Sequence, residues 1–335
     1  MEYNVSAMQA PSPGLARQEV PQMQDKQGKR GARVWKWLGI FAQIVLAVFC
    51  LYQITASSHI HIKQIEQPLV HLSWSYLLLG ITCFVVVMIF SALRYYLLLP
   101  KTVPLRYLLA TSFVQNALLS FLPWRLGEVS YPFLLRRDYN IPIAQSTALI
   151  IMIRVVDLLV VLAVAATAGP QLGLPTQWLL LIMIVGLLVF CGVALYFRKH
   201  QMPRRFTSAV TALEGLQDPR RFFAFMLLST TMFVLTTLQS VFILRAMALG
   251  ISFRHTAILN ALGLIIGLLP IHPPGGWGTM DSLQTLLLDR LGYREAQALP
   301  SILAAHSVYT VLIFIGGILG WLLLKQCRPR VIRGA

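Results

Sequence analysis

An apolar helical run breaks at a Leu-Pro pair within Ala117-Leu-Leu-Ser-Phe-Leu-Pro-Trp-Arg-Leu-Gly-Glu128. A second run breaks in the same way within Gly263-Leu-Ile-Ile-Gly-Leu-Leu-Pro-Ile-His-Pro-Pro-Gly-Gly-Trp-Gly-Thr-Met-Asp281. Both runs are too short or too polar to span a bilayer comfortably, and both continue into a turn that contains glycine. Paired interrupted hydrophobic segments in corresponding positions of two halves are typical of the binding site of a membrane transporter.

The composition is that of an integral membrane protein. Hydrophobic residues make up 57% of the 335 residues, charged residues make up 12%, and the mean hydropathy is +0.69. Several runs exceed the roughly 20 apolar residues that cross a hydrocarbon core. The net charge of +16 lies mainly in loops beside these runs, where it meets anionic lipid headgroups, so no nucleic-acid partner is expected. The four scattered cysteines form no C-x-x-C pair, so neither a metal site nor a cofactor is expected.

The hydrophobic pattern predicts an all-α fold: a polytopic membrane helical bundle of about six spanning helices and two re-entrant helical hairpins. The predicted spans are about 37–55, 74–98, 142–168, 177–197, 222–247 and 299–324. The predicted hairpin arms are about 105–122 with 126–137, and 255–270 with 279–291. Non-helical backbone at membrane depth is tolerated only when it is buried in protein or lines a wet cavity.

The distribution of lysine and arginine predicts the orientation. With a cytoplasmic N-terminus and hairpins that return to their own side, most of these residues, Arg94 included, lie on the cytoplasmic side. We therefore expect a multi-pass protein of the inner membrane with both termini in the cytoplasm. Each half then holds two spans, a hairpin and a third span, which predicts two inverted repeats at about 37–168 and 177–324.

Three segments follow from this organisation. Residues 1–33 are rich in Pro, Gln, Gly and Ser without an apolar period, and we expect a disordered cytoplasmic arm. Residues 34–325 form the membrane domain. Residues 326–335 form a basic cytoplasmic tail.

Two charged residues, Arg154 and Asp157, lie near the middle of the span at 142–168. Three residues apart, they share one face of a helix. A charge at the bilayer centre is costly, so such residues pair, face the bundle interior or line a polar path. Two interpretations stay open. Arg154 is part of a structural pair with Asp157, Glu128 or hairpin carbonyls, or it contacts an anionic headgroup or belongs to a proton site.

The tip of the first hairpin holds Arg125, Gly127 and Glu128. A turn there aims helix ends and free amides into the cavity, and the fork of an arginine suits a phosphate. Glu128 is either the partner of Arg125, a titrating group coupled to protons, or a cap on the returning helix.

The second hairpin is a helix-forbidding turn of prolines and glycines. We count Gly276 and Gly278 among the substrate-binding candidates. His272 is either a polar lining residue or a hydrogen-bonded structural one, and Asp281 is either a cap on the returning helix or a site residue. His306 in the last span is a candidate for a titrating group or a headgroup contact.

The order and spacing of these motifs resemble the transmembrane region of lysylphosphatidylglycerol synthases, a flippase-like family, over about residues 38–325. The resemblance implies an inner-membrane protein similar to a translocator of aminoacylated phosphatidylglycerol, or, as in single-domain relatives, of other lipids or lipid-linked glycans. Two positions depart from the family pattern. Gly278-Thr-Met-Asp281 stands where the family usually has Gly-x-x-Glu, and His306 stands where it often has arginine. The sequence ends soon after the last span, so we expect a stand-alone member without the synthase domain.

These features favour a flippase that translocates a lipid or lipid-linked anionic substrate, with membrane lipids as partners. A small-solute carrier, a membrane-embedded enzyme on lipid phosphates and a non-transporting scaffold remain as alternatives. An enzyme needs convergent acids, histidines or metal ligands. The sequence has no D-x-D, H-E-x-x-H or C-x-x-C pattern, so we expect no enzyme. The oligomeric state stays open, a homo-oligomer included.

Overall fold

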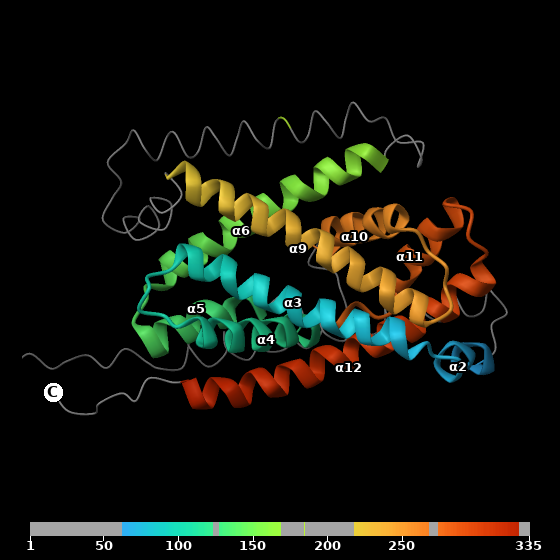
Figure 1. Ribbon diagram of the computed structural model, residues 1–335, viewed down its shortest axis with the longest axis horizontal. Helices are drawn as coiled ribbons and strands as arrows, with labels where there is room; N and C mark the ends of the chain where they lie inside the picture. The colour runs from blue at the N-terminus through green and yellow to red at the C-terminus, as the bar shows by residue number, and fades with distance from the viewer. Residues whose placement is uncertain (1–61, 123–126, 169–183, 185–217, 268–273, 328–335) are drawn as a thin grey trace, which may run out of the picture. The chain divides into compact units, whose positions relative to one another are not determined.

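The computed structural model describes residues 62–122, 127–168, 184, 218–267 and 274–327 (Figure 1). Within these ranges the secondary structure is helical and no strand occurs. The elements are α2 (Ile62–Val70), α3 (Trp74–Leu98), α4 (Leu105–Phe121), α5 (Gly127–Tyr139), α6 (Ile143–Ala168), α9 (Pro219–Ala246), α10 (Phe253–Gly267), η3 (Pro274–Gly276), α11 (Thr279–Arg290) and α12 (Glu295–Cys327).

Four of the described helices, α3, α6, α9 and α12, are long and apolar enough to cross a membrane. They match four of the predicted spans, although α12 extends beyond its predicted span at both ends. The predicted all-α, polytopic helical bundle is confirmed. The predicted spans at about 37–55 and 177–197, and the predicted arm at 1–33, lie outside the described residues apart from Ile184.

Local sequence signals set several helix ends. The Asp218 side chain accepts a hydrogen bond of 3.0 Å from the backbone N–H of Arg220, and Pro219 is the first residue of α9. At the end of α5, Asn140 adopts a left-handed φ of 57°, and Pro142 follows two residues later. These residues place the turn between α5 and α6, and therefore the start of the helix that carries the charged pair.

Close helix packing joins α3 to α9 and α4 to α12. Small residues allow the approach at both interfaces. A Cβ atom added at Gly80 of α3 would lie 2.8 Å from Ile243 Cγ1 of α9. A Cβ atom added at Gly320 of α12 would lie 2.5 Å from Phe113 Cβ and 2.9 Å from the Ala110 carbonyl oxygen of α4. Small residues at such contacts are characteristic of transmembrane helix pairs, because they let the backbones approach closely.

The outer surface of α12 is apolar. Exposed large side chains recur along it at helical spacing, at Val311, Phe314, Ile315, Ile318, Leu319 and Leu322, and Trp321 and Leu323 near its end are exposed as well. Gly316 and Gly320 lie on another face of the same helix, against α4. The division of α12 into a small-residue face and a large apolar face is the pattern expected of a helix between protein and lipid.

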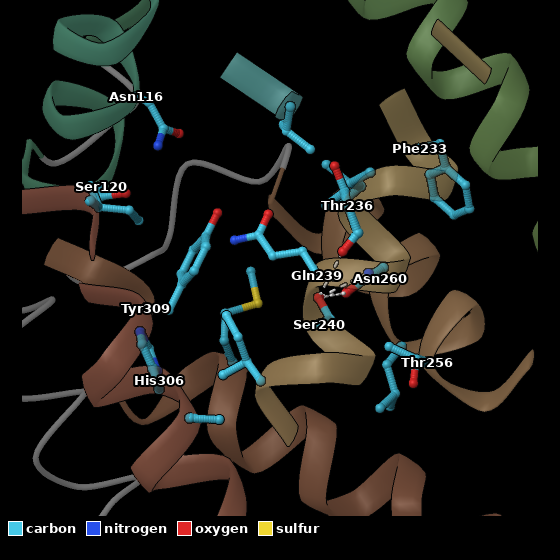
Figure 2. Close-up of a pocket in the computed structure, with 18 of the residues that line it drawn as sticks. Asn116, Ser120, Phe233, Thr236, Gln239, Ser240, Thr256, Asn260, His306 and Tyr309 are labelled. Carbon is cyan, nitrogen blue, oxygen red and sulfur yellow. Dashed lines mark hydrogen bonds between the residues drawn. The ribbon is translucent and has the colours of Figure 1, made fainter. Parts of the chain in front are cut away.

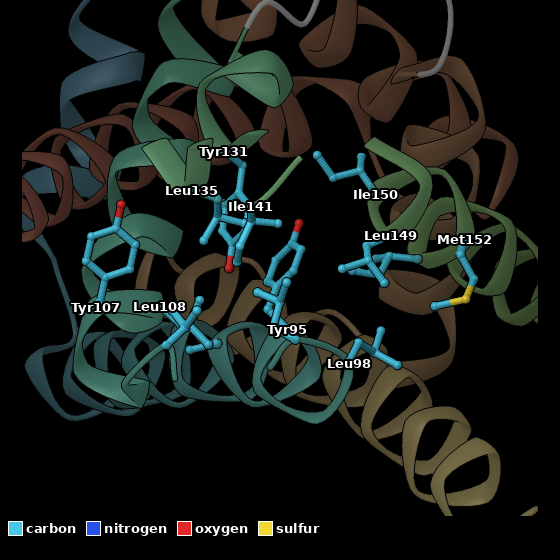
Figure 3. Packing of buried hydrophobic residues seen from close by; sticks show 14 of the residues in the cluster. Tyr95, Leu98, Tyr107, Leu108, Tyr131, Leu135, Ile141, Leu149, Ile150 and Met152 are labelled. Carbon is cyan, nitrogen blue, oxygen red and sulfur yellow. The ribbon is translucent and has the colours of Figure 1, made fainter. Parts of the chain in front are cut away.

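An aromatic cluster in the core joins α3, α4 and α5 (Figure 3). The rings of Tyr95 and Tyr131 stack with their centroids 4.0 Å apart. The hydroxyl of Tyr107 lies 2.9 Å from Asp138 Oδ2 and 3.0 Å from the Leu134 carbonyl oxygen, so it can donate to either. α4 and α5 therefore pack firmly together, and α10 likewise contacts α11. The re-entrant path of these pairs and the inverted repeat stay predictions.

We expect Gly320→Ala to destabilise the protein by roughly 1–3 kcal/mol, because the new methyl group overpacks the interface between α4 and α12 against backbone that cannot rotate away. Thermal unfolding of the purified protein in detergent measures the effect. Gly250→Ala is the matched control, since a Cβ atom there meets nothing within 4 Å. Equal unfolding temperatures for the two variants would contradict the packing described here.

Candidate functional site

The two charged residues of α6 lie in a row of four alternating charges. Asp157 Oδ1 lies 2.5 Å from Nη1 of Arg94 on α3, and Asp157 Oδ2 lies 3.8 Å from Arg154 Nη1. Arg154 Nη2 lies 3.0 Å from Oε1 of Glu128 on α5. We call these four side chains, in the order Arg94, Asp157, Arg154 and Glu128, the charge chain. Both carboxylates weighed as partners of Arg154 are therefore in contact with it.

Pairing makes these charges tolerable inside the bundle. The Arg94 side chain is 4% exposed, and the other three are between 22% and 28% exposed. An isolated charge at the centre of a membrane helix costs roughly 2.5–3.5 kcal/mol on insertion scales. The formal charges of the chain cancel, and each inner member faces an opposite charge on both sides. Removing Asp157 leaves the buried Arg94 without its ion-pair partner, and for a buried pair such a loss costs about 3–5 kcal/mol.

Arg94, which lies in the predicted span at 74–98, was expected on the cytoplasmic side. The structure buries it, and its Nη1 also lies 3.4 Å from the Ser229 hydroxyl of α9. Its Nε has no hydrogen-bond partner among the described residues. The signal that could have identified it is that its charge is opposite to that of Asp157, the only acidic residue in the predicted span at 142–168.

Glycine at position 127 explains how Glu128 reaches the charge chain. α5 begins at Gly127, and a Cβ atom there would overlap the backbone of Leu118 and Leu119 in α4. Only a residue without a side chain allows the first turn of α5 to contact α4 this closely. Glu128 follows in the first turn of α5, where a carboxylate is also stabilised by the helix dipole. Arg125 lies outside the described residues.

The turn before α11 depends on glycine conformations. Gly275, Gly276 and Gly278 have φ values of 74°, 74° and 80°, a region that residues with a side chain rarely adopt. Asp281, which is 1% exposed, accepts a hydrogen bond of 2.9 Å from the Gly278 backbone N–H. It therefore serves as the cap on the returning helix that the sequence suggested. His272 lies outside the described residues.

His306 of α12 stabilises this turn through two polar contacts and a stacked ring. Its Nδ1 lies 2.7 Å from Asp281 Oδ1, and its Nε2 lies 2.9 Å from the Gly275 carbonyl oxygen. Its ring stacks on Trp277 with centroids 4.2 Å apart and planes 5° apart. A carbonyl oxygen can only accept, so Nε2 donates to Gly275. Asp281 is thus both a cap and the partner of His306.

A cavity of about 450 Å³ lies between these two clusters. Helices α3, α4, α6, α9, α10, α11 and α12 and the turn η3 contribute to its walls. Of the predicted site residues, Arg154, Asp157 and His306 line it. Glu128 contacts Arg154, and Asp281 contacts His306, without themselves lining the cavity. The glycines at 127, 276 and 278 allow the backbone of the two turns. The structure therefore brings the described candidates from the α4–α5 and the α10–α11 segments around one cavity.

Sequence reasoning missed the neutral polar residues of this cavity. Figure 2 shows them on several helices, and the lining includes Asn116, Ser120, Thr236, Gln239, Ser240, Thr256, Asn260 and Tyr309. Three of them on α9, at 236, 239 and 240, follow helical spacing and so share one face. Polar residues at that spacing within a long apolar run were the sequence feature that could have predicted a polar face on α9. No group of three His, Cys, Asp or Glu residues in the described ranges could hold a metal ion.

We expect Arg94→Met and Asp157→Leu each to destabilise the protein by about 3–5 kcal/mol, since one leaves the Asp157 carboxylate inside the bundle without its nearest cation and the other leaves the buried Arg94 without its ion-pair partner. The double variant restores neutrality and leaves the pair of Arg154 and Glu128 intact, so its loss should be well below the sum of the single losses. Thermal unfolding in detergent measures all three variants. Additive losses would show that Arg94 and Asp157 do not depend on one another.

Replacing His306 with phenylalanine keeps a ring that can stack on Trp277 and removes both hydrogen bonds. We expect faster amide hydrogen exchange at the start of α11, because Asp281 loses the partner that fixes it. His255→Phe is the matched control, since His255 Nδ1 lies 3.0 Å from the Tyr293 hydroxyl, beyond the other end of α11. Unchanged exchange in residues 279–284 of the His306 variant would contradict the fastening role.

Comparison with known families agrees with this architecture. Residues 40–317 match the family described as the lysylphosphatidylglycerol synthase TM region, and so more than half of the chain is covered. No curated protein matches the chain. The match includes all the described site residues and the four described helices that can cross a membrane, although not the last ten residues of α12. The chain therefore belongs to the lysylphosphatidylglycerol synthase TM region family and is a multi-pass integral membrane protein.

Proposed function

We propose that this protein is a flippase that translocates a lipid, or a lipid-linked substrate, with an anionic headgroup between the leaflets of the inner membrane. The observation that carries the proposal is a cavity whose largely apolar wall holds an arginine and several neutral polar side chains, inside a bundle whose membrane-spanning helices expose large apolar side chains. Its volume of about 450 Å³ lies within the range of small-ligand sites. A headgroup could occupy this cavity while its acyl or prenyl chains stay in the bilayer.

Arg154 is the proposed contact for the anionic group. Its two terminal nitrogens face Asp157 and Glu128, but its Nε is buried and has no hydrogen-bond partner among the described residues. A phosphate oxygen that displaces the Glu128 carboxylate can accept from the terminal nitrogens of Arg154. Binding would therefore replace the Glu128 carboxylate with a phosphate at Arg154. The arginine would have an anionic partner both with and without the ligand.

The hairpins supply the proposed moving parts. α4, α5, α10 and α11 have 17, 13, 15 and 12 residues. At about 1.5 Å per residue none reaches across a hydrocarbon core of about 30 Å, which supports re-entrant hairpins in two inverted repeats. The positive-inside rule supports cytoplasmic termini. Alternating access would then arise from movement of one repeat against the other around the cavity.

The proposed role is transport without covalent chemistry. The one carboxylate among the described lining residues, Asp157, faces two arginines and is poorly placed to act as a base. The proposed partners are membrane lipids with anionic headgroups, and the cavity suits neither nucleic acid nor a scaffold role. A homo-oligomer remains open.

The test is the leaflet distribution of lipids in a deletion strain complemented with wild type, Arg154→Ala or Arg106→Ala. We expect wild type to restore the distribution and Arg154→Ala to lower the rate roughly ten- to a hundredfold, the equivalent of about 1.5–3 kcal/mol for a hydrogen bond to a charged group. Arg106 is exposed, so its variant should transport normally.

Two outcomes would count against the proposal. Normal transport by Arg154→Ala at normal protein levels would remove Arg154 from the mechanism. An unchanged distribution of every lipid class on deletion, with wild type confirmed in the membrane, would favour a small-solute carrier instead.

A further inference from the structure

We infer that Asn116, Ser120 and Tyr309 form the uncharged part of the phosphate site, and that they donate to the phosphate oxygens that Arg154 does not hold. We call these three side chains the donor cluster. The inference rests on the proposed function and adds binding residues to the same cavity. Figure 2 shows the donor cluster on one side of the space, with the polar side chains of α9 and α10 on the other.

Two closely packed helices position the donor cluster. Asn116 and Ser120 are four residues apart and so share one face of α4, and Tyr309 lies on α12. A Cβ atom added at Gly317 of α12 would lie 2.5 Å from the Cβ atom of Ala117, so the two helices approach closely beside Asn116. This packing fixes the positions of the donors before a ligand arrives.

The ring of Tyr309 is held by other rings. The ring centroid of Phe84 on α3 lies 6.3 Å from that of Tyr309 and 6.0 Å from that of Phe113 on α4, and both pairs are edge-to-face. Figure 2 shows the hydroxyl of Tyr309 pointing into the cavity. Packing therefore fixes the ring and leaves the hydroxyl available to a ligand.

The donor cluster has no partner that competes with a ligand. No hydrogen bond among the described residues involves its three side chains. They are half-buried, and their polar atoms are not among the buried atoms without a partner, so a ligand in the cavity reaches them. The hydroxyls of Thr236 and Ser240 on α9 differ, because they donate to carbonyl oxygens of their own helix at 2.8 and 3.1 Å. Gln284 also lines the cavity without a partner, but it is the one polar lining residue that α11 contributes.

The donor cluster lies at the level of the ion pair that the ligand is proposed to open. Gly127 contacts the α4 backbone in the turn between Asn116 and Ser120. Glu128 is the next residue, and its Oε1 lies 3.0 Å from Arg154 Nη2. A phosphate that takes the place of the Glu128 carboxylate therefore enters a cavity whose wall carries the unused donors at that turn of α4.

Uncharged donors suit a phosphate that must both bind and leave. The non-bridging oxygens of a phosphate ester without bound protons can only accept, so each contact needs a donor from the protein. Arg154 supplies the positive charge, and the donor cluster supplies two hydrogens from the Asn116 amide and one from each hydroxyl. A second arginine in their place would need its own anion in the empty protein. Neutral hydrogen bonds avoid that need, and they are weak enough to allow release.

The experiment measures binding to the purified full chain in detergent by native mass spectrometry. Dioleoyl phosphatidic acid presents a phosphate, and dioleoylglycerol has the same chains without it. Tyr309→Phe keeps the ring that packs on Phe84 and removes the hydroxyl, and Ser120→Ala removes a second donor. We expect each variant to bind phosphatidic acid about three- to tenfold more weakly than wild type, the effect of one neutral hydrogen bond, and to bind dioleoylglycerol as wild type does.

Thr256→Val is the matched control, because Thr256 lines the cavity but its hydroxyl already donates to the Ser252 carbonyl oxygen at 3.0 Å. Its affinity for phosphatidic acid should match that of wild type. Asn116→Leu serves as a further variant if Tyr309→Phe does not fold. Inorganic phosphate at an equal concentration identifies the source of the phosphate. We expect it not to displace phosphatidic acid, since burial of the acyl chains adds to lipid binding.

The outcomes separate the two proposals. Unchanged affinity of the donor-cluster variants for phosphatidic acid, or equal losses for both lipids, would overturn the donor cluster and leave the flippase proposal standing. Absence of saturable binding of phosphatidic acid to wild type would count against the phosphate site itself, and the donor cluster would fall with it. Displacement by an equal concentration of inorganic phosphate, with the same sensitivity to the variants, would support the donor cluster and favour a small-solute carrier over a flippase.

Discussion

The pairing of charges within the helical bundle is the constraint on which the rest of the structure depends. Arg94, Asp157, Arg154 and Glu128 come from α3, α6 and α5, and each would be costly inside the membrane without the others. Gly127 contacts the α4 backbone and so holds the first turn of α5, with Glu128, beside α6. The packing of five helices is thus coupled to one electrostatic requirement, since Ser229 of α9 also contacts Arg94.

The contacts of Asp281 and His306 have a different role, because they hold a turn in place rather than a set of membrane-spanning helices. Three glycines with positive φ make the turn possible, and Asp281 and His306 hold it against α12. The two positions that the resemblance singled out, Asp281 and His306, are in direct contact. A short acid and a flat ring therefore meet at this turn.

Much of this could be predicted from the sequence, and the failures have physical reasons. Long apolar runs defined α3, α6 and α9 within a few residues, because membrane thickness sets their length. Arg154 and Asp157 were conspicuous as charges within such a run. Gln239 was not, since a neutral amide on an apolar helix has no distinctive pattern until the cavity is known.

Contacts between distant segments were beyond single-sequence reasoning. Asp281 and His306 are 25 residues apart, and each had been weighed separately. Arg94 resembled an interfacial charge because it lies close to the end of its span, and only the packing of α3 against α6 and α9 shows that it is buried. Gly127 was recognised as part of a turn, whereas its contact with the α4 backbone depends on tertiary structure.

The neutrality of the charge chain has a consequence for electrical behaviour. A unit charge that crosses the membrane field gains or loses about 2.3 kcal/mol per 100 mV. The four formal charges sum to zero, so a movement that carries the whole group through the field does almost no electrical work. The resting membrane voltage would then neither drive nor oppose a movement of these four side chains together, and any voltage dependence of the proposed transport would come from other charges, the cargo's included.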